Sequence, residues 1–294
     1  MQQVLPVRLV LGRPGLHNYF VPCQSSAGSH RVHVTEWGDA ANPNVLICVH
    51  GLTRCGRDFD VMAEALADRY RVVCPDVVGR GESDWLVNKA DYTYPQYVSD
   101  MVRVIAKTGQ KSVHWLGTSM GGIIGMVLAA QPNTPITRMV LNDLGSFIPK
   151  ASLERIGMYV GVSPLFRSVD EVVEAMRLVS PFGPLTDDQW HTLTLPLIKK
   201  TSSGMWQFRY DPAIGDSFRQ QPIEDVDLSE FWDAVQCPVL LTRGAESDLL
   251  LASTFEHMCT KPNVTGVTFA ATGHAPMFQD AYSIAVVRKF LLGT

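Results

Sequence analysis

The sequence predicts an α/β protein with a mostly parallel central sheet, flanked by helices, and a helical cap inserted between two strands. Three observations lead to this fold class. Short β-branched runs alternate with longer helix-like segments, which is the pattern of strands joined by covering helices. Several runs are apolar nearly throughout, as expected when helices cover both faces of a sheet. The alternation then fails between residues 146 and 235.

The alternating elements are expected to form one core domain from residues 1–145 and 236–294. Strands are predicted at residues 30–36, 45–49, 70–74, 113–116, 138–142, 238–242 and 264–269. Helices are predicted at residues 59–68, 94–108, 121–130 and 281–292. The chain has 294 residues, of which 46% are hydrophobic, and this supplies ample apolar material for one large core.

Residues 146–235 lack a convincing strand. They carry amphipathic helical segments at residues 169–179 and 186–199, punctuated by prolines. Ligands of open α/β sheets bind beyond the carboxyl ends of the strands, so a long insertion at this point is expected to form a helical cap over those ends. The alternative is that the insertion extends the core.

Charge and hydropathy limit the partners. The formal net charge is −4 and the 25 Lys and Arg residues form no run, whereas nucleic-acid binding needs a basic face. Small neutral substrates fit better. No segment approaches the roughly 20 apolar residues that span a bilayer, and Arg8 and Arg13 make residues 1–15 a poor signal peptide. The sequence leaves a homo-oligomer open.

The cysteines favour a cytoplasmic location. The chain contains six, without paired spacing, and three of them lie in or beside apolar strand-like runs. This is typical of core thiols in a reducing compartment rather than of disulfides. No Cys-x-x-Cys pair or His/Cys cluster with zinc spacing occurs, so neither a metal nor another cofactor is expected.

A candidate nucleophile lies at residues 117–121, Gly-Thr-Ser-Met-Gly. A predicted strand precedes this pentapeptide and a predicted helix follows it. A sharp turn from strand to helix strains the serine backbone and lifts its hydroxyl clear of the sheet, while the glycines remove side chains that would clash. The pattern alone is common, but in this context it favours Ser119 as a catalytic nucleophile over a turn-forming serine.

A serine nucleophile needs a general base that is oriented by a carboxylate. His274 follows the last predicted strand, and Asp248 follows the strand before it in a Gly-x-x-Ser-Asp loop. Both therefore fall at the carboxyl ends of strands, and Asp248 is the preferred acid. Asp143, at the end of another strand, and Glu246, in the same loop as Asp248, are the competing candidates. Without a catalytic role, Asp143 would hold the loop that leads into the cap.

The oxyanion of an acyl-transfer intermediate needs backbone donors. Residues 50–53, His-Gly-Leu-Thr, follow the strand at 45–49, so the amide of Leu52 is expected to converge with that of Met120, the residue after the nucleophile. His50 is then expected to brace this loop through hydrogen bonds. A further glycine-rich loop, residues 76–84, lies at the same edge. Its Ser83 has no strand-to-helix turn around it and is not predicted to be a nucleophile.

Taken together, these motifs resemble the α/β-hydrolase superfamily, in its capped serine esterase and meta-cleavage-product hydrolase type. The resemblance covers nearly the whole chain. It rests on His50-Gly51, Asp76 with residues 79–83, residues 117–122, Asp248 and Gly273-His274. Each motif alone is modest, but their joint order and spacing are specific, and the resemblance implies an α/β-hydrolase fold with a Ser-Asp-His triad.

The resemblance also narrows the chemistry. Haloalkane dehalogenases and epoxide hydrolases carry Asp at the position of Ser119, which argues against both. Meta-cleavage-product hydrolases, which cut carbon–carbon bonds, typically have Asn at the position of Thr118 and an aromatic residue soon after the catalytic histidine. Here Ala275 and Pro276 follow His274. This counts against that activity, which remains the main alternative.

The leading expectation is therefore an enzyme that hydrolyses small carboxylic esters, including short hydroxyalkanoate oligomers, through an acyl-enzyme on Ser119. Less favoured are a lactonase, a perhydrolase and a non-catalytic ligand receptor. Aromatic and sulfur-containing side chains of the insertion are candidates to line an apolar substrate pocket. The candidates chosen for substrate binding are Phe166, Trp190, Met205 and Trp206.

Overall fold

The central feature of the computed structural model is an eight-stranded sheet in the order β1-β2-β4-β3-β5-β6-β11-β12. The structure describes residues 15–220 and 222–293, so the prediction about a signal peptide falls almost wholly outside it. The strands are β1 (Leu16–Ser25), β2 (Gly28–Trp37), β3 (Val45–Val49), β4 (Arg71–Pro75), β5 (Val113–Thr118), β6 (Ile136–Asn142), β11 (Val239–Gly244) and β12 (Val264–Phe269). The pairs β1–β2 and β2–β4 are antiparallel and the remaining pairs are parallel. The predicted mostly parallel sheet is confirmed.

The apolar runs form strands because both faces of the sheet are covered. All five residues of β3 are buried, and their side chains alternate between faces, as the strand period of two requires. Val45, Ile47 and Val49 belong to one apolar cluster, and Leu46 and Cys48 to another. The sheet therefore separates two core layers.

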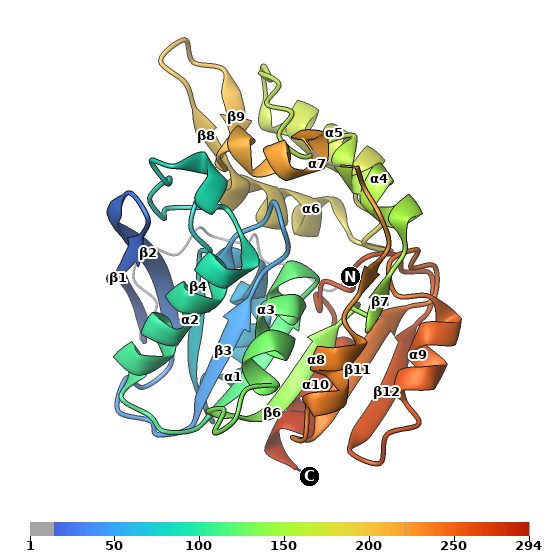
Figure 1. Cartoon of the computed structure of the whole chain (residues 1–294). Coiled ribbons are helices and arrows are strands. Elements are labelled where there is room, and N and C mark those ends of the chain that lie inside the picture. Colours follow the sequence, from blue (N-terminus) through green and yellow to red (C-terminus); the bar gives the residue numbers. More distant parts are fainter. Residues whose placement is uncertain (1–14, 221, 294) are drawn as a thin grey trace, which may run out of the picture.

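Helices complete each layer. Helices α1 (Asp60–Leu66) and α10 (Ala281–Leu292) supply Met62, Leu66 and Val287 to one cluster. On the other face, α2 (Tyr94–Thr108), α3 (Met120–Ala129), α8 (Ser229–Ala234) and α9 (Ala252–Met258) supply side chains such as Met101 and Ile124. Figure 1 shows α3 lying against the central strands β3 and β6. The predictions for residues 94–108 and 281–292 match α2 and α10 in full.

Most of the segment between β6 and β11, apart from α8, lies at one end of the sheet (Figure 1). It contains β7 (Phe147–Ile148), α4 (Lys150–Gly157), α5 (Val169–Val179), α6 (Asp187–Thr194), β8 (Ile198–Lys200), β9 (Trp206–Phe208), α7 (Asp216–Gln220) and β10 (Val226–Asp227). Short 3-10 turns cover Gly56–Phe59, Lys89–Asp91, Leu195–Leu197 and Pro212–Gly215. β7 and β10 pair antiparallel where the segment leaves and rejoins the sheet.

Parts of this segment differ from the predictions. The helix expected over residues 186–199 ends at Thr194, and the chain turns through Leu195–Leu197 into β8. Pro196 cannot continue a helix, because its ring clashes with the preceding turn and it lacks an amide hydrogen. The hairpin β8–β9 was not predicted. In α8, Trp232 packs into the core cluster beside the sheet. The chain therefore rejoins the core before residue 235. The limits of the core domain and of the cap remain a prediction.

Candidate active site

Ser119 lies between the end of β5 and the first residue of α3. Its backbone has φ 52° and ψ −117°, a strained conformation of the kind that clusters at functional sites. The turn is so tight that glycine is required on both sides. A Cβ atom on Gly117 would lie 2.3 Å from the carbonyl oxygen of Gly121, and one on Gly121 would lie 2.0 Å from that of Val49. The predicted nucleophile turn therefore has the required geometry.

His274 connects the serine to a carboxylate. Its Nε2 lies 3.0 Å from Ser119 Oγ, and its Nδ1 lies 2.8 Å from Asp143 Oδ2. Because a carboxylate can only accept, Nδ1 carries the hydrogen and Nε2 is free to accept from the serine hydroxyl. The three side chains form the arrangement by which a histidine activates a serine.

The carboxylate in this arrangement belongs to Asp143, the competing candidate in the sequence. Asp143 directly follows β6, is fully buried and has a positive φ of 51°. Its Oδ1 accepts from the Gly244 amide at 2.8 Å, and its Oδ2 accepts from Ser247 Oγ at 2.6 Å as well as from His274. These donors satisfy the buried charge and fix the carboxylate in place.

The preference for Asp248 as the partner of His274 was wrong. Its carboxylate oxygens instead accept from Arg155 Nε at 2.6 Å and Nη2 at 2.8 Å, and its side chain is 46% exposed. The Gly-x-x-Ser-Asp loop does reach the site, but through Gly244 and Ser247, which hold the carboxylate of Asp143. Glu246 is exposed.

Asn142, which the sequence analysis did not single out, ties the loops together. Its buried side-chain amide donates to Thr118 Oγ1 at 2.9 Å and to the Pro276 carbonyl at 2.8 Å. Its carbonyl oxygen accepts from Thr242 Oγ1 at 2.8 Å. The nucleophile turn and the histidine loop are therefore fastened to the same strand end. Its position directly before Asp143 was the available signal in the sequence.

The predicted oxyanion donors occupy suitable positions. Met120 is the first residue of α3, where an amide has no partner within the helix and the helix dipole favours negative charge. Leu52 lies in the loop after β3 and lines the same cavity as Ser119. Within residues 15–220 and 222–293, neither amide donates a hydrogen bond to another protein group. Within those residues, both amides therefore lack a protein acceptor.

His50 braces the Leu52 loop. Its Nε2 accepts from the Val77 amide at 2.9 Å, so Nδ1 carries the hydrogen and donates to the Gly51 carbonyl at 2.7 Å. Complete burial lowers the pKa of His50 to about 4, because the charged imidazolium loses its hydration. The predicted bracing by hydrogen bonds agrees with this geometry.

A cavity of about 220 Å³ opens above Ser119 and His274. The insertion supplies much of its wall, including Tyr159, Phe166, Ala175, Met176, Phe182 and Phe208. Of the four side chains predicted to bind substrate, Phe166 lines this cavity. The prediction for the other three, Trp190, Met205 and Trp206, does not agree with the structure, which places them outside its lining.

The three residues pack elsewhere for physical reasons. Trp190 stacks on Phe182, with ring centroids 5.6 Å apart, inside the apolar cluster between α5 and α6. Trp206 pairs through its backbone with Phe166, and its side chain packs against that cluster. The carbonyl of Met205 accepts from Thr201 and closes the β8–β9 turn. The side chains of Trp190 and Trp206 therefore support the wall behind the cavity.

Arg54 and Asp58 form a buried ion pair on the mainly apolar cavity wall. Arg54 Nε and Nη2 donate to the two Asp58 oxygens at 2.8 and 2.6 Å. Burial raises the pKa of Asp58, since the anion loses hydration. The sequence analysis missed this pair, although the four-residue spacing of opposite charges was available as a signal.

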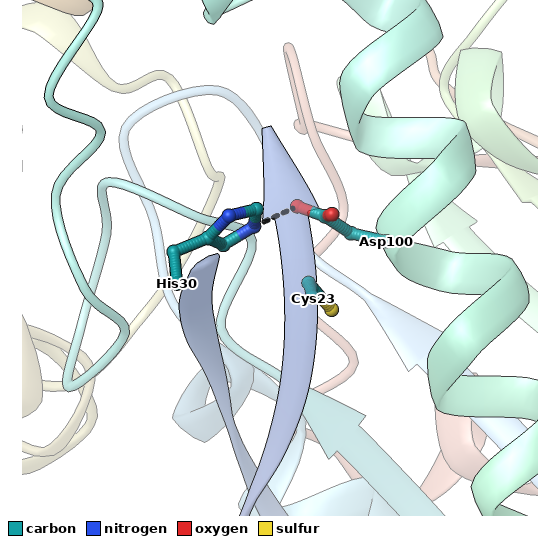
Figure 2. A group of neighbouring side chains, drawn as sticks. All are labelled: Cys23, His30 and Asp100. Carbon is teal, nitrogen blue, oxygen red and sulfur yellow. Dashed lines mark hydrogen bonds and ion pairs between the residues drawn. The ribbon is translucent and has the colours of Figure 1, made fainter. Parts of the chain in front are cut away.

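One group in the described part of the chain has donor types that bind metals. Figure 2 shows Cys23, His30 and Asp100, which come from β1, β2 and α2. His30 Nε2 and Asp100 Oδ2 are 2.9 Å apart. Burial and the neighbouring carboxylate raise the pKa of Cys23 to about 12, so the thiolate that a metal needs is costly to form. We interpret the group as a buried hydrogen-bonded contact between the β1–β2 hairpin and α2.

The fold and these loops define the class of protein. A sequence model of the α/β hydrolase fold family matches residues 44–281. The chain belongs to this family. Among its relatives is the 3-hydroxybutyrate-oligomer hydrolase of Cupriavidus necator, which is 45% identical over 284 residues, covering 93% of this chain and 97% of the relative.

Solved structures of other proteins share this fold. A crystal structure of an α/β hydrolase from Novosphingobium aromaticivorans superimposes with a TM-score of 0.86 and 35% identity, covering 96% of this chain and 100% of that chain. E-2-(acetamidomethylene)succinate hydrolase superimposes with a TM-score of 0.79 over 94% of this chain and 99% of that one. Its identity is 19%, so this likeness concerns the fold. In the described residues, no helix is long and apolar enough to span a bilayer.

Proposed function

We propose that this protein is a serine hydrolase that cleaves the ester bonds of short 3-hydroxyalkanoate oligomers. The observation that carries the proposal is the continuous hydrogen-bonded chain from Ser119 through His274 to the buried carboxylate of Asp143. Its chemistry is acyl transfer to the serine and then to water.

In the first half of the reaction, Ser119 Oγ attacks the ester carbonyl carbon while His274 Nε2 takes the hydroxyl proton. The carbonyl oxygen becomes an anion, which the amides of Leu52 and Met120 stabilise. The intermediate then collapses, and the alcohol oxygen leaves with the proton from His274. Asp143 keeps the imidazole in the required tautomer and stabilises its charged form.

In the second half, His274 takes a proton from a water molecule, whose oxygen attacks the acyl carbon. Collapse of this second intermediate breaks the bond to Ser119 Oγ, which recovers its proton from His274. The products are a hydroxyacid and a shortened oligomer. No step needs a metal or a redox cofactor, because each proton is exchanged through His274.

The substrate class is supported by the relative and by the cavity. The Cupriavidus necator hydrolase shares 45% identity over almost the full length of both chains. The cavity wall is mainly apolar with one charged pair, which suits short chains that carry methyl groups and regularly spaced ester oxygens. Cleavage of carbon–carbon bonds in meta-cleavage products remains the alternative to be tested. A cytoplasmic location, a homo-oligomer and the absence of nucleic-acid partners remain predictions.

The proposal is tested with purified wild type and Ser119→Ala. Substrates are p-nitrophenyl esters of increasing chain length, the dimer and trimer of 3-hydroxybutyrate, and a 2-hydroxy-6-oxo-dienoate. We expect wild type to hydrolyse the simple esters and the oligomers, and Ser119→Ala to lose at least about 10⁴-fold in kcat. Ester turnover that survives in Ser119→Ala, or turnover of the dienoate alone, would contradict the proposal.

A further inference from the structure

Arg80 is the central residue of the glycine-rich loop that the sequence analysis placed at the edge of the site without assigning it a role. Its side chain is fully buried. A buried charge loses its hydration and is tolerated where other groups compensate for that loss. The contacts of the guanidinium therefore indicate the role of this buried charge.

The guanidinium lies between the two residues that supply the oxyanion donors. Arg80 Nε donates to the carbonyl of Leu52 at 2.7 Å, and Nη2 lies 3.5 Å from Met120 Sδ. Nη1 donates to the carbonyl of Val78 at 2.8 Å. The guanidinium carbon also lies 4.9 Å from the ring centroid of Tyr97. The guanidinium thus holds the Leu52 loop and the start of α3 at the same time.

No carboxylate among the described residues pairs with this cation. Asp76, in the same loop, accepts instead from the amides of Gly56 and Glu82 and from His33 Nδ1. Carbonyl dipoles, a thioether and an aromatic face surround Arg80. They satisfy the hydrogen bonds of the guanidinium, but within the described residues none of these contacting groups carries a negative charge. A buried positive charge of this kind acts strongly in a site of low dielectric constant.

We propose that Arg80 is a positioning residue that sets the oxyanion hole, holding the Leu52 loop against α3 and adding positive potential where the oxyanion forms. This inference rests on the proposed function. The ester substrate is uncharged, so this positive potential has little effect on substrate binding. The tetrahedral intermediate is an anion, so the same potential stabilises it and lowers the barrier to acyl transfer. Losing this potential therefore reduces kcat rather than raising KM.

The loop of Arg80 also contacts the insertion. Arg80 and Tyr210 form an isolated antiparallel bridge, with the Asp211 amide donating to the Gly79 carbonyl at 2.8 Å and the Gly81 amide to the Arg209 carbonyl at 3.0 Å. Tyr210 lines the substrate cavity. The same loop therefore fixes both the oxyanion hole and one side of the cavity.

The experiment compares wild type, Arg80→Met and Arg80→Lys with p-nitrophenyl butyrate. Two inhibitors of equal chain length accompany it: a trifluoromethyl ketone, which adds Ser119 to form an oxyanion, and a methyl ketone, which binds uncharged. For Arg80→Met we expect kcat to fall about 10²-fold, near the lower end for loss of an oxyanion donor. KM should stay within about threefold. Trifluoromethyl ketone affinity should fall with kcat, while methyl ketone affinity is retained.

Arg80→Lys keeps the charge, but a single ammonium group cannot contact the Leu52 carbonyl and Met120 Sδ at the same time. We therefore expect an intermediate loss of about tenfold in kcat. The matched control is Arg71→Met, which removes another poorly exposed guanidinium, here paired with Glu36 at 2.8 Å. It should lower the melting temperature and leave kcat unchanged. Folding of every variant is checked by circular dichroism and thermal unfolding.

The inference would be overturned by a folded Arg80→Met with wild-type kcat, or by equal weakening of both ketones. Failure of both arginine variants to fold would also overturn it, because the guanidinium would then be a requirement of the core. The proposed function fails separately, if wild type lacks ester turnover or Ser119→Ala retains it.

Discussion

Ser119 and Asp143 both have a positive φ, of 52° and 51°, which residues with a side chain rarely adopt. Each follows a parallel strand directly, β5 and β6 respectively. A backbone conformation in such a sparsely populated region costs on the order of 1–3 kcal/mol. The surrounding hydrogen bonds offset this cost and turn both side chains toward His274. Strain at two neighbouring strand ends therefore marks the site more clearly than either motif does.

Ser119 and His274 could be predicted because each lies in a local pattern, a turn between glycines and a histidine after the last strand. The acid could not be chosen in this way. Asp143 and Asp248 both follow strands, and the choice depends on which loop bends under His274. That bend is fixed by contacts between Ser247, Gly244 and Asp143, which are distant in the sequence.

Substitution of the two aspartates separates their roles. Asp143→Asn should lower kcat by about 10³–10⁴-fold, because the amide no longer holds the active tautomer of His274 or its charge. Asp248→Asn should change kcat less than threefold, since it breaks a partly exposed ion pair with Arg155. Steady-state kinetics with p-nitrophenyl butyrate measures both. A large loss in Asp248→Asn with an active Asp143→Asn would reverse the assignment.

His50 makes stability depend on pH. Its pKa is about 4 in the folded protein and about 6.5 when unfolded, so the unfolded chain binds the extra proton between these values. The stabilisation is present above pH 6.5 and is lost as pH falls toward 4, to a total on the order of 3 kcal/mol for this residue. His114, whose pKa burial also lowers to about 4, acts in the same direction.

Urea unfolding of wild type and His50→Asn between pH 6.5 and 4.5 measures this contribution. The variant loses two hydrogen bonds and is less stable at every pH, so the informative quantity is the slope of unfolding free energy against pH. That slope should be clearly smaller in His50→Asn. An unchanged slope would contradict the assignment of a neutral His50. His114→Asn is the matched comparison and should reduce the slope as well.

At the scale of elements, strands buried on both faces could be predicted well. β3, which is buried throughout, has the predicted bounds because its apolar residues run without interruption between polar turns. The edge strand β12 also has the predicted bounds, although most of its residues are exposed or half-buried. β1 was missed, since Leu16–Ser25 contains His, Asn, Gln and Pro and is mostly exposed or half-buried. It forms because β2 offers a full antiparallel partner. Pairing partners of this kind are decided by tertiary structure, beyond local preference.

The nucleophile turn should be among the least tolerant elements. In Gly121→Ala the new methyl group would lie 2.0 Å from the Val49 carbonyl oxygen and 3.0 Å from that of His50, so β3 and α3 would have to separate. We expect a loss above about 3 kcal/mol in unfolding free energy. Gly109→Ala is the control. Its φ is +75°, and a Cβ atom added there would meet no atom of a non-neighbouring residue within 4 Å. Only the backbone strain, about 1–2 kcal/mol, therefore applies. Equal losses would contradict the steric argument.

At the scale of the whole molecule, the position of the insertion could be predicted, whereas of the four side chains predicted to face the cavity only Phe166 does so. The break in alternation located the insertion between β6 and β11. Which aromatic side chains point inward depends on how α5, α6 and the β8–β9 hairpin pack together, and these contacts leave no period in the sequence. Trp190 and Trp206 are large and apolar, yet they pack within the insertion, where their burial stabilises the wall.

The cavity should set the preferred chain length. Ala175, on α5, lines it, and Leu178, on the same helix, is 87% exposed. Ala175→Phe should reduce the kcat/KM for p-nitrophenyl octanoate at least tenfold relative to the acetate, because the ring occupies space that a long chain needs. Leu178→Phe should leave that ratio unchanged. If both variants shift the ratio equally, the long chain does not lie in this cavity.

The insertion also forms hydrogen bonds with the loops that carry His274 and Arg80. The Gly273 amide donates to the Pro181 carbonyl at 2.7 Å, directly before His274, and residues 209–211 hold the loop of Arg80. The insertion and the loops of the core domain are thus joined by backbone hydrogen bonds next to the site. An engineer who grafts a foreign cap onto this core to change the substrate should carry over Pro181 and residues 209–211, or rebuild their hydrogen bonds, before judging the new specificity.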